Sequence, residues 1–402
     1  MPRSPSLSAS AQRIRPGVFA ELERHIAAFA ARGGELIPLH IGDTYLAPPE
    51  AARFATAVSS ETRDPSLYRY GPTAGLPALR DAIAREARER RGMAEVDGAR
   101  HVHVGVGGTH ALFCAVRATL DPGDEVLVAA PYWPLAPGIF HACGARPVEV
   151  PFTSLLYGDP SLDAGEVLAE ALTPRTRAIY FISPNNPDGK VLSRKHLEQI
   201  AALAAARDLW VFADEVYAET AFDAPHTSMA TLPGMAARTM SLYSFSKSHA
   251  LAGARVGYVI APEEVVLAMR RVSTHTVFNV PLAMQRAALA ALDGGSQWTL
   301  DARATYRTAR DASALRLAGS KIRFSLAEGG TYLFLDFSAA IGDAPMSKLL
   351  ALAVDRGVLL APGDAFGQTY ESFARLCFTS VPLPKVLEGI DRLRAATDAL
   401  LR

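Results

Sequence analysis

A lysine and an arginine follow one apolar run in the segment SLYSFSKSHALAGARVGY, residues 241–258. Lys247 comes directly after the run, and Arg255 stands further along between Gly253 and Gly257. Most lysines extend their ammonium group into water, so a solvent-facing Lys247 is the ordinary interpretation. A lysine that can lose its proton inside a pocket can instead form a Schiff base with an aldehyde. The neighbouring motifs have to decide between these two roles.

Three further segments place polar or flexible residues at the end of an apolar run. The run LWVFA is followed by Asp214, RAIYFIS by PNNPDG at 184–189, and HVHVGV by Gly107, Gly108 and Thr109. Taken singly, the glycines and PNNPDG are typical of tight turns, and Asp214 could cap a helix. A carboxylate that ends a buried strand also needs a cation or hydrogen-bond donors. For Asp214 the capping and binding interpretations are therefore evenly balanced.

The segments that carry these residues alternate between helical patterns and short apolar runs. Helical periodicity is clear in LPALRDAIAREARER and SRKHLEQIAALAAARD, and among such stretches lie EVLVAA, RAIYFIS, LWVFAD, TMSLYSF and RVGYVIA. Apolar strands separated by helices predict an α/β fold with a mostly parallel sheet between helices. Ligands bind beyond the carboxyl ends of such strands, so the four segments should gather at one edge.

The chain should divide into a larger and a smaller part, because 402 residues exceed the usual size of one core. We expect an N-terminal arm with part of the small domain at 1–49, a large cofactor-binding domain at 50–292, and a linking helix with a smaller α+β domain at 293–402. The pattern predicts one long helix from about Pro281 through QWTLDARATYRTARDASALRL, then strands at KIRFSL, GTYLFLDF and SFARLCFTS.

Composition argues against several classes of protein. Lys+Arg and Asp+Glu balance at 41 each, which disfavours binding to nucleic acid or to an anionic membrane. Cys114, Cys143 and Cys377 form no C-x-x-C pair, so neither a disulfide framework nor a zinc site is expected. The sequence has no apolar stretch of the roughly 20 residues that a membrane helix needs, and its start lacks the apolar core of a secretory signal. We expect a cytoplasmic protein.

One small molecule would use all of these groups at once. An amine that can lose its proton binds an aldehyde, and glycine N–H groups, hydroxyls and Arg255 suit a phosphate. An acid at the end of a buried strand would keep a ring nitrogen protonated. Pyridoxal 5′-phosphate carries the aldehyde, the phosphate and the pyridine nitrogen, and its usual protein partners are a lysine and an acid. The sequence therefore predicts this cofactor, attached to Lys247.

The motifs also form an ordered set, which consists of YRYGPTAGLPALRDAIA, GGTHAL, PYW, PNNPDG, DEVY, SFSKSHALAGARVGY and FARLCF. From about Leu39 to the C-terminus, this set resembles the class I and II aminotransferases of fold type I. The resemblance implies a homodimer with shared active sites. It also implies a ping-pong reaction that moves the amino group of an L-amino acid to a 2-oxo acid.

The resemblance assigns a role to each motif residue. Lys247 would hold the cofactor and move the proton of the substrate Cα, and Asp214 would pair with the pyridine nitrogen. Asn186 and Tyr217 would hydrogen-bond the phenolic oxygen of the ring, and Arg375 would clamp the substrate carboxylate. The other implied positions are Gly108, Thr109, Ser244, Ser246 and Arg255 at the phosphate, Tyr70 at the phosphate of the neighbouring subunit, Trp133 over the ring, and Gly42, between Ile41 and Asp43, at the substrate entrance.

The identity of the substrate is less well defined. Some relatives carry a lysine at the position of Thr109, which would bind a second carboxylate, but here the residue is threonine. We therefore expect a neutral or aromatic L-amino acid, with Tyr45, Trp133 and Phe278 as candidate wall residues. A lyase, synthase or racemase of the same fold and cofactor, for example a carbon–sulfur lyase, stays open as the alternative.

Overall fold

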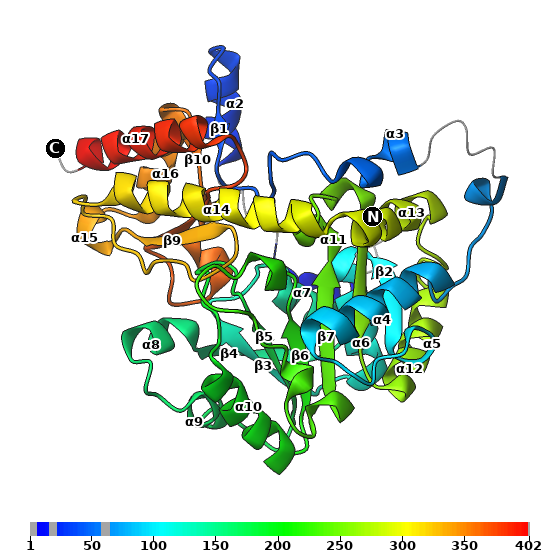
Figure 1. The fold of residues 1–402 in the computed structure, drawn as a ribbon. Helices are drawn as coiled ribbons and strands as arrows, with labels where there is room; N and C mark the ends of the chain where they lie inside the picture. Colours follow the sequence, from blue (N-terminus) through cyan, green and yellow to red (C-terminus); the bar gives the residue numbers. More distant parts are fainter. Residues whose placement is uncertain (1–5, 16–21, 58–64, 401–402) are drawn as a thin grey trace, which may run out of the picture.

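The computed structural model describes residues 6–15, 22–57 and 65–400, and its centre is one seven-stranded sheet (Figure 1). The strand order is β2-β8-β7-β6-β5-β3-β4, and every neighbouring pair is parallel except the two that involve β8. This arrangement confirms the mostly parallel sheet. The strands are β2 (Val102–Val106), β3 (Glu125–Ala130), β4 (Arg146–Pro151), β5 (Thr176–Ile182), β6 (Trp210–Asp214), β7 (Thr239–Ser244) and β8 (Val256–Ile260).

Helices cover both faces of this sheet, as the alternation along β3 illustrates. Val126 and Val128 pack in one apolar cluster with Leu112, whereas Leu127 packs in another with Ile200. A strand covered on both sides becomes a continuous apolar run, which is why the sequence pattern revealed it. The helices of this part are α4 (Pro77–Arg91), α5 (Gly98–His101), α6 (Gly107–Thr119), α7 (Ala136–Ala142), α8 (Thr153–Gly158), α9 (Ala164–Ala169), α10 (Arg194–Ala206), α11 (Phe245–Ser248), α12 (Glu263–Thr274) and α13 (Leu282–Gly294).

A smaller part joins the C-terminal third to an N-terminal segment. Three antiparallel strands, in the order β11-β12-β9, form its main sheet, and β1 pairs in parallel with β10. In Figure 1 the long helix α14 runs from beside α13 into this part. Its elements are β1 (Ile37–Pro38), β9 (Tyr332–Asp336), β10 (Val358–Leu359), β11 (Ala361–Pro362), β12 (Phe373–Cys377), α2 (Glu23–Ala31), α14 (Ser296–Leu317), α15 (Ser338–Ile341), α16 (Met346–Asp355) and α17 (Leu383–Leu400); the short helices α1 (Ala9–Gln12) and α3 (Phe54–Ala57) lie outside both sheets.

Two expected elements differ from the structure. The single helix from Pro281 is broken into α13 and α14 at Gly295, where a Cβ would lie 2.2 Å from the carbonyl oxygen of Ala291. The segment KIRFSL forms no strand, because it meets β9 only through an isolated bridge between Arg323 and Asp336. In addition, β4 was not predicted, since this edge strand is only partly buried and its sequence RPVEVP has no continuous apolar run.

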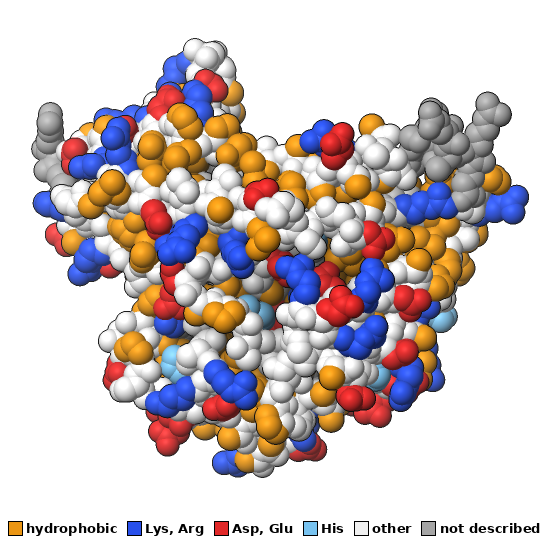
Figure 2. Space-filling model, in the orientation of Figure 1, with side chains coloured by type: hydrophobic (Ala, Val, Ile, Leu, Met, Phe, Trp, Pro, Cys, Tyr) orange, Lys and Arg blue, Asp and Glu red, His pale blue; other side chains and the backbone are white. Residues whose placement is uncertain are grey.

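The surface carries both signs of charge. Figure 2 shows acidic and basic side chains mixed over the face it presents, in keeping with the balanced composition. Among the described residues, no helix combines the length and the apolar character needed to cross a membrane.

Candidate functional site

A cavity of about 260 Å³ lies where the central strands of the main sheet end. Tyr70 is the one predicted site residue that does not line it, since its ring is 86% exposed and packs against Phe278. Of the candidate wall residues, Trp133 lines this cavity, whereas Tyr45 lines a separate one and Phe278 is exposed and lines neither. The predicted residues that line it are Gly42, Gly108, Thr109, Trp133, Asn186, Asp214, Tyr217, Ser244, Ser246, Lys247, Arg255 and Arg375.

The strand directions explain why these residues meet. β5, β6 and β7 are parallel, so the loops that follow them, with Asn186, Asp214 and Lys247, leave the sheet at one edge. β8 is antiparallel to both β2 and β7, so β2 also ends at this edge, whereas β8 begins there. Arg255 precedes β8 directly, which brings it beside the helix α6 that follows β2.

Backbone and side chains at this edge form a cradle for an anion. Helix α6 begins at Gly107, so the N–H groups of its first turn have no partner within the helix. A Cβ on Gly107, whose φ is +71°, would lie 2.4 Å from Nη2 of Arg255, and a Cβ on Gly257 would lie 2.4 Å from the amide nitrogen of Gly108. Arg255 also donates to Oγ of Ser246 at 3.3 Å. Only glycines permit so close an approach of the backbone to the arginine.

Asp214 is a buried acid that forms no ion pair among the described residues, although the charge of Lys247 acts to lower its pKa. Its Oδ2 accepts from the Tyr180 hydroxyl at 2.9 Å and its Oδ1 from the Val216 amide at 3.4 Å. Burial raises the pKa of Asp214 to about 6, since these two hydrogen bonds offset only part of the desolvation. None of the ion pairs within the described ranges involves this carboxylate, which lines the cavity. Such an acid would be stabilised by a positively charged group inside the cavity.

Lys247 lies in the short helix α11 and lines the cavity instead of extending into water. Its Nζ donates a hydrogen bond to the carbonyl oxygen of Gly42, a residue from the segment between β1 and α3. An N-terminal residue of the smaller part therefore closes the cavity over the amine.

Arg375 on β12 enters the cavity from the smaller part and is only 8% exposed. Its Nη1 donates to Oδ1 of Asn186 at 2.8 Å and its Nη2 to the carbonyl oxygen of His40 at 2.8 Å. Its buried Nε has no hydrogen-bond partner in the part of the chain that the structure describes. Because a guanidinium can only donate, it fixes the amide oxygen of Asn186 and leaves the NH₂ group of that side chain to donate elsewhere.

A tyrosine pair completes the wall between Arg375 and the main sheet. The hydroxyls of Tyr217 and Tyr332 lie 2.7 Å apart, and the guanidinium carbon of Arg375 lies 4.2 Å from the centre of the Tyr332 ring. Burial raises the pKa of Tyr217, so this hydroxyl keeps its proton. Tyr332 was missed in the sequence, where GTYLFLDF reads only as a buried strand.

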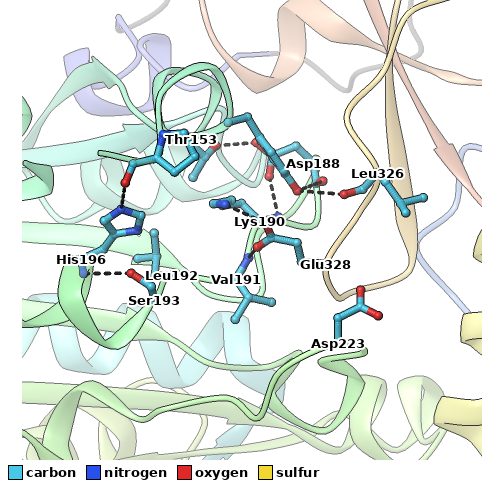
Figure 3. Close-up of polar contacts among 12 residues, drawn as sticks. Thr153, Asp188, Lys190, Val191, Leu192, Ser193, His196, Asp223, Leu326 and Glu328 are labelled. Carbon is cyan, nitrogen blue, oxygen red and sulfur yellow. Dashed lines mark hydrogen bonds and ion pairs between the residues drawn. The ribbon is translucent and has the colours of Figure 1, made fainter. Parts of the chain in front are cut away.

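Asp188 holds the loop that carries Asn186 through buried hydrogen bonds. Figure 3 shows Asp188 beside Thr153, with Lys190 and Glu328 near them. One carboxylate oxygen of Asp188 accepts from the Asn185 side chain at 2.8 Å and from the Lys190 amide at 3.1 Å, and the other accepts from Thr153. Lys190 Nζ itself reaches Glu328 at 2.7 Å. These bonds fix the loop through buried groups outside the cavity.

Comparison with known proteins gives consistent matches over nearly the whole chain. Residues 34–393 match the family model described as aminotransferase class I and II. The arginine–pyruvate transaminase of Pseudomonas aeruginosa is 37% identical over 91% of both chains, and the aspartate/prephenate aminotransferase of Thermus thermophilus is 32% identical over 96% of this chain and 98% of the relative. A solved mutant of Thermus thermophilus aspartate aminotransferase superposes with a TM-score of 0.89 at 28% identity, covering 98% of this chain and 100% of that one.

Proposed function

This chain belongs to the class I and II aminotransferases, and we propose that it uses pyridoxal 5′-phosphate to move an amino group from an L-amino acid to a 2-oxo acid. Its activity as an aminotransferase follows from the family. The observation that carries the cofactor is that one cavity holds both a lysine amine and a buried acid that forms no ion pair among the described residues. The anion cradle around Arg255 lies in the same cavity.

The residues present fit this cofactor. The phosphate would be held by the first turn of α6 together with Thr109, Ser244, Ser246 and Arg255. Asp214 would pair with the protonated ring nitrogen, which supplies the positive charge that its buried carboxylate lacks. The phenolic oxygen would accept hydrogen bonds from Tyr217 and from the amide NH₂ of Asn186, and Trp133 would cover the ring. Gly108 and Gly42 line the cavity, which supports roles at the phosphate and at the substrate entrance. Tyr70 does not line it, and its role at the phosphate of a second subunit follows from the family resemblance and from its exposure.

When bound, pyridoxal 5′-phosphate supplies an aldehyde for the amine and a ring that withdraws electrons from the substrate Cα. Arg375 binds the substrate carboxylate through its guanidinium group and so sets which substrate bond faces Lys247. The Lys247 amine would act as the base that accepts the Cα proton of the substrate and carries it. The Asp214 carboxylate would keep the ring nitrogen protonated. Two such half-reactions, with an amino acid and then with a 2-oxo acid, complete a ping-pong cycle.

A neutral or aromatic substrate agrees best with the lining of the cavity. The apolar side chains that line the cavity include Leu112, Trp133 and Ile182. Within the described ranges the basic lining residues are Lys247, Arg255 and Arg375, and each already has a role. None of these three residues is left to pair with a second substrate carboxylate, and position 109 carries a threonine instead of a lysine.

Assembly and location are further parts of the proposal. Tyr68 and Tyr70 are 93% and 86% exposed, which suits a segment that covers a second subunit in a homodimer. The three buried cysteines are unpaired thiols, and this supports a cytoplasmic setting. The division into 1–49, 50–292 and 293–402 remains a prediction, which limited proteolysis at the two boundaries would test.

A half-reaction assay tests the proposed function. Purified holoenzyme is mixed with one L-amino acid at a time, without a 2-oxo acid, and its visible absorption is followed. We expect one equivalent of 2-oxo acid per site, fastest with neutral or aromatic amino acids, and no reaction after borohydride fixes the cofactor to Lys247. Repeated turnover with release of ammonia or sulfide would instead support the lyase alternative. Lys247→Ala should lose the fixed label and the activity together, so label on another residue would contradict the assignment.

A further inference from the structure

The two tyrosines in the wall of the cavity form an isolated hydroxyl pair. Tyr217 follows β6 of the main sheet, and Tyr332 begins β9 of the smaller part. Both side chains are about 2% exposed or less, and their hydroxyl oxygens lie 2.7 Å apart. Neither hydroxyl has another hydrogen-bond partner among the described residues. The bond between them therefore fixes how their two protons are shared.

Each hydroxyl has one proton, so only one of the two can donate to the other. If Tyr217 donated to Tyr332, it would have no proton left for a group inside the cavity. If Tyr332 donates, Tyr217 accepts that bond and keeps its own proton for a second partner. A hydroxyl that accepts one hydrogen bond is also polarised into a stronger donor.

Arg375 favours the second arrangement. Its guanidinium carbon lies 4.2 Å from the centre of the Tyr332 ring, within the range of a cation–π contact. A cation over the ring withdraws electron density from the phenol, which strengthens its hydroxyl as a donor. No cation–π contact among the described residues involves the Tyr217 ring, so the two tyrosines differ in this respect.

The Tyr332 hydroxyl occupies the space that a side chain at position 42 would fill. A Cβ on Gly42 would lie 1.9 Å from the Tyr332 hydroxyl oxygen, and the carbonyl of the same glycine accepts from Lys247. The position of the Tyr332 hydroxyl therefore depends on glycine at position 42. Because Gly42 has no side chain, the Tyr332 side chain can extend from the smaller part to Tyr217.

We propose that Tyr332 is a positioning residue, whose hydroxyl donates to Tyr217 and thereby directs the Tyr217 proton to the phenolic oxygen of the cofactor. This inference rests on the proposed function. A donor at the phenolic oxygen competes with the nitrogen by which Lys247 is attached, because that oxygen otherwise shares the proton of this nitrogen. Loss of the Tyr332 hydroxyl should weaken the donor and so raise the pH at which the attached nitrogen releases its proton.

The test is a pH titration of the visible absorption of the holoenzyme, without substrate. Tyr332→Phe removes one oxygen atom. We expect the pH midpoint of the absorption change to rise by about 0.3–1 pH unit, which corresponds to a fraction of the free energy of one hydrogen bond. Tyr217→Phe should raise it more, and the double variant should titrate like Tyr217→Phe alone, because Tyr332 acts through Tyr217. Tyr370→Phe is the matched control, since this buried hydroxyl bonds Ser154 outside the cavity and its loss should not move the midpoint.

A second variant perturbs the same hydroxyl without altering a tyrosine. Gly42→Ala should displace Tyr332 and shift the midpoint in the same direction, which keeps the inference testable if Tyr332→Phe folds poorly. An unchanged midpoint in Tyr332→Phe, or shifts that add in the double variant, would overturn the inference while the wild-type spectrum upholds the cofactor. A wild-type protein that bound no cofactor at Lys247 would overturn the proposed function and this inference with it.

Discussion

The end of β6 carries two adjacent acids that lie in different surroundings. Asp214 lines the cavity, and Glu215 points away from it, although both are fully buried. Burial raises the pKa of Asp214 to about 6. Burial acts on Glu215 in the same direction, but the bond and the charge of His226, with further hydrogen bonds, outweigh it and lower the pKa of Glu215.

The difference lies in the partners that the fold provides. Glu215 accepts from Ser228 and the Met229 amide at 2.9 Å each, from the Tyr243 hydroxyl, and faces His226 at 3.4 Å. Among the described residues, Asp214 accepts hydrogen bonds only from the Tyr180 hydroxyl and, at 3.4 Å, from the Val216 amide. The chain thus satisfies one acid internally and leaves its neighbour for a ligand. An incompletely satisfied buried group is the kind of local conflict that folds retain at functional sites.

The largest expected effect is on activity at Asp214. Asp214→Asn keeps the shape but cannot hold the ring nitrogen protonated, so we expect kcat to fall by about 10²–10³-fold or more while cofactor still binds. Steady-state kinetics with saturating substrate, alongside the cofactor content of the purified variant, measure both quantities. Glu215→Gln is the matched control, since the same change one residue away should leave kcat within a few fold. Equal losses of kcat in the two variants would abolish the distinction between the acids.

The next effect concerns the other side of the cavity. Arg375→Lys preserves the charge but loses the paired geometry toward a carboxylate and the contact with Asn186. We expect KM for the amino acid to rise by about 10–100-fold, from the loss of charge-assisted hydrogen bonds, with a smaller change in kcat. Arg323→Lys is a suitable control, because this exposed arginine pairs with Asp336 outside the cavity. An unaltered KM would place the carboxylate clamp elsewhere.

Glu215 should matter for stability. Glu215→Gln places an NH₂ group among the donors that now meet the carboxylate, and we expect the free energy of unfolding to fall by about 1–3 kcal/mol. Because the folded pKa of Glu215 is lowered, its contribution is present above the unfolded value of 4.5 and is lost as the pH falls through the folded pKa. Urea unfolding should therefore show that the free energies of unfolding of wild type and variant differ less at pH 4 than at pH 7. A constant difference would mean that the charge of Glu215 plays no part.

The sequence predicted those parts of the fold and site that depend on local pattern. Apolar runs that end in a polar residue placed Asn186, Asp214 and Lys247 at one sheet edge, because parallel strands share an edge. The break at Gly295 was missed, since the helical period continues across it and the contacts with Ala291 and His249 that forbid a side chain there are not visible in the sequence.

Contacts between distant segments were not available from the sequence. The Lys247 amine meets Gly42, and Tyr332 meets Tyr217, across 205 and 115 positions. No spacing rule links such pairs. Glu215 carried no predicted role, because its partners Ser228 and Tyr243 lie 13 and 28 positions further along the chain and no spacing rule links them to it.

The smallest expected effect reverses the sign found for Glu215. In the protein freed of cofactor, Asp214 has a folded pKa of about 6 against an ordinary value of 3.8, so the folded state binds more protons between these values and loses stability as the pH rises through them. About two pKa units correspond to roughly 3 kcal/mol of destabilisation above pH 6. Asp214→Asn removes the destabilisation by the buried charge. The hydrogen bonds of the asparagine to Tyr180 and Val216 are weaker than those of the carboxylate, and this offsets about 1–2 kcal/mol of the gain in stability.

We therefore expect cofactor-free Asp214→Asn to be more stable than cofactor-free wild type by about 1 kcal/mol at pH 7.5, with the advantage vanishing near pH 4. Urea unfolding of the two proteins at both pH values measures this. When both proteins are saturated with cofactor, the wild type should be the more stable one. The charged Asp214 then has the ring nitrogen as its partner, so cofactor binding stabilises the wild type more than the variant. If the variant were the less stable protein even without cofactor, Asp214 would be a satisfied acid like Glu215, and the fold would not have reserved it for a ligand.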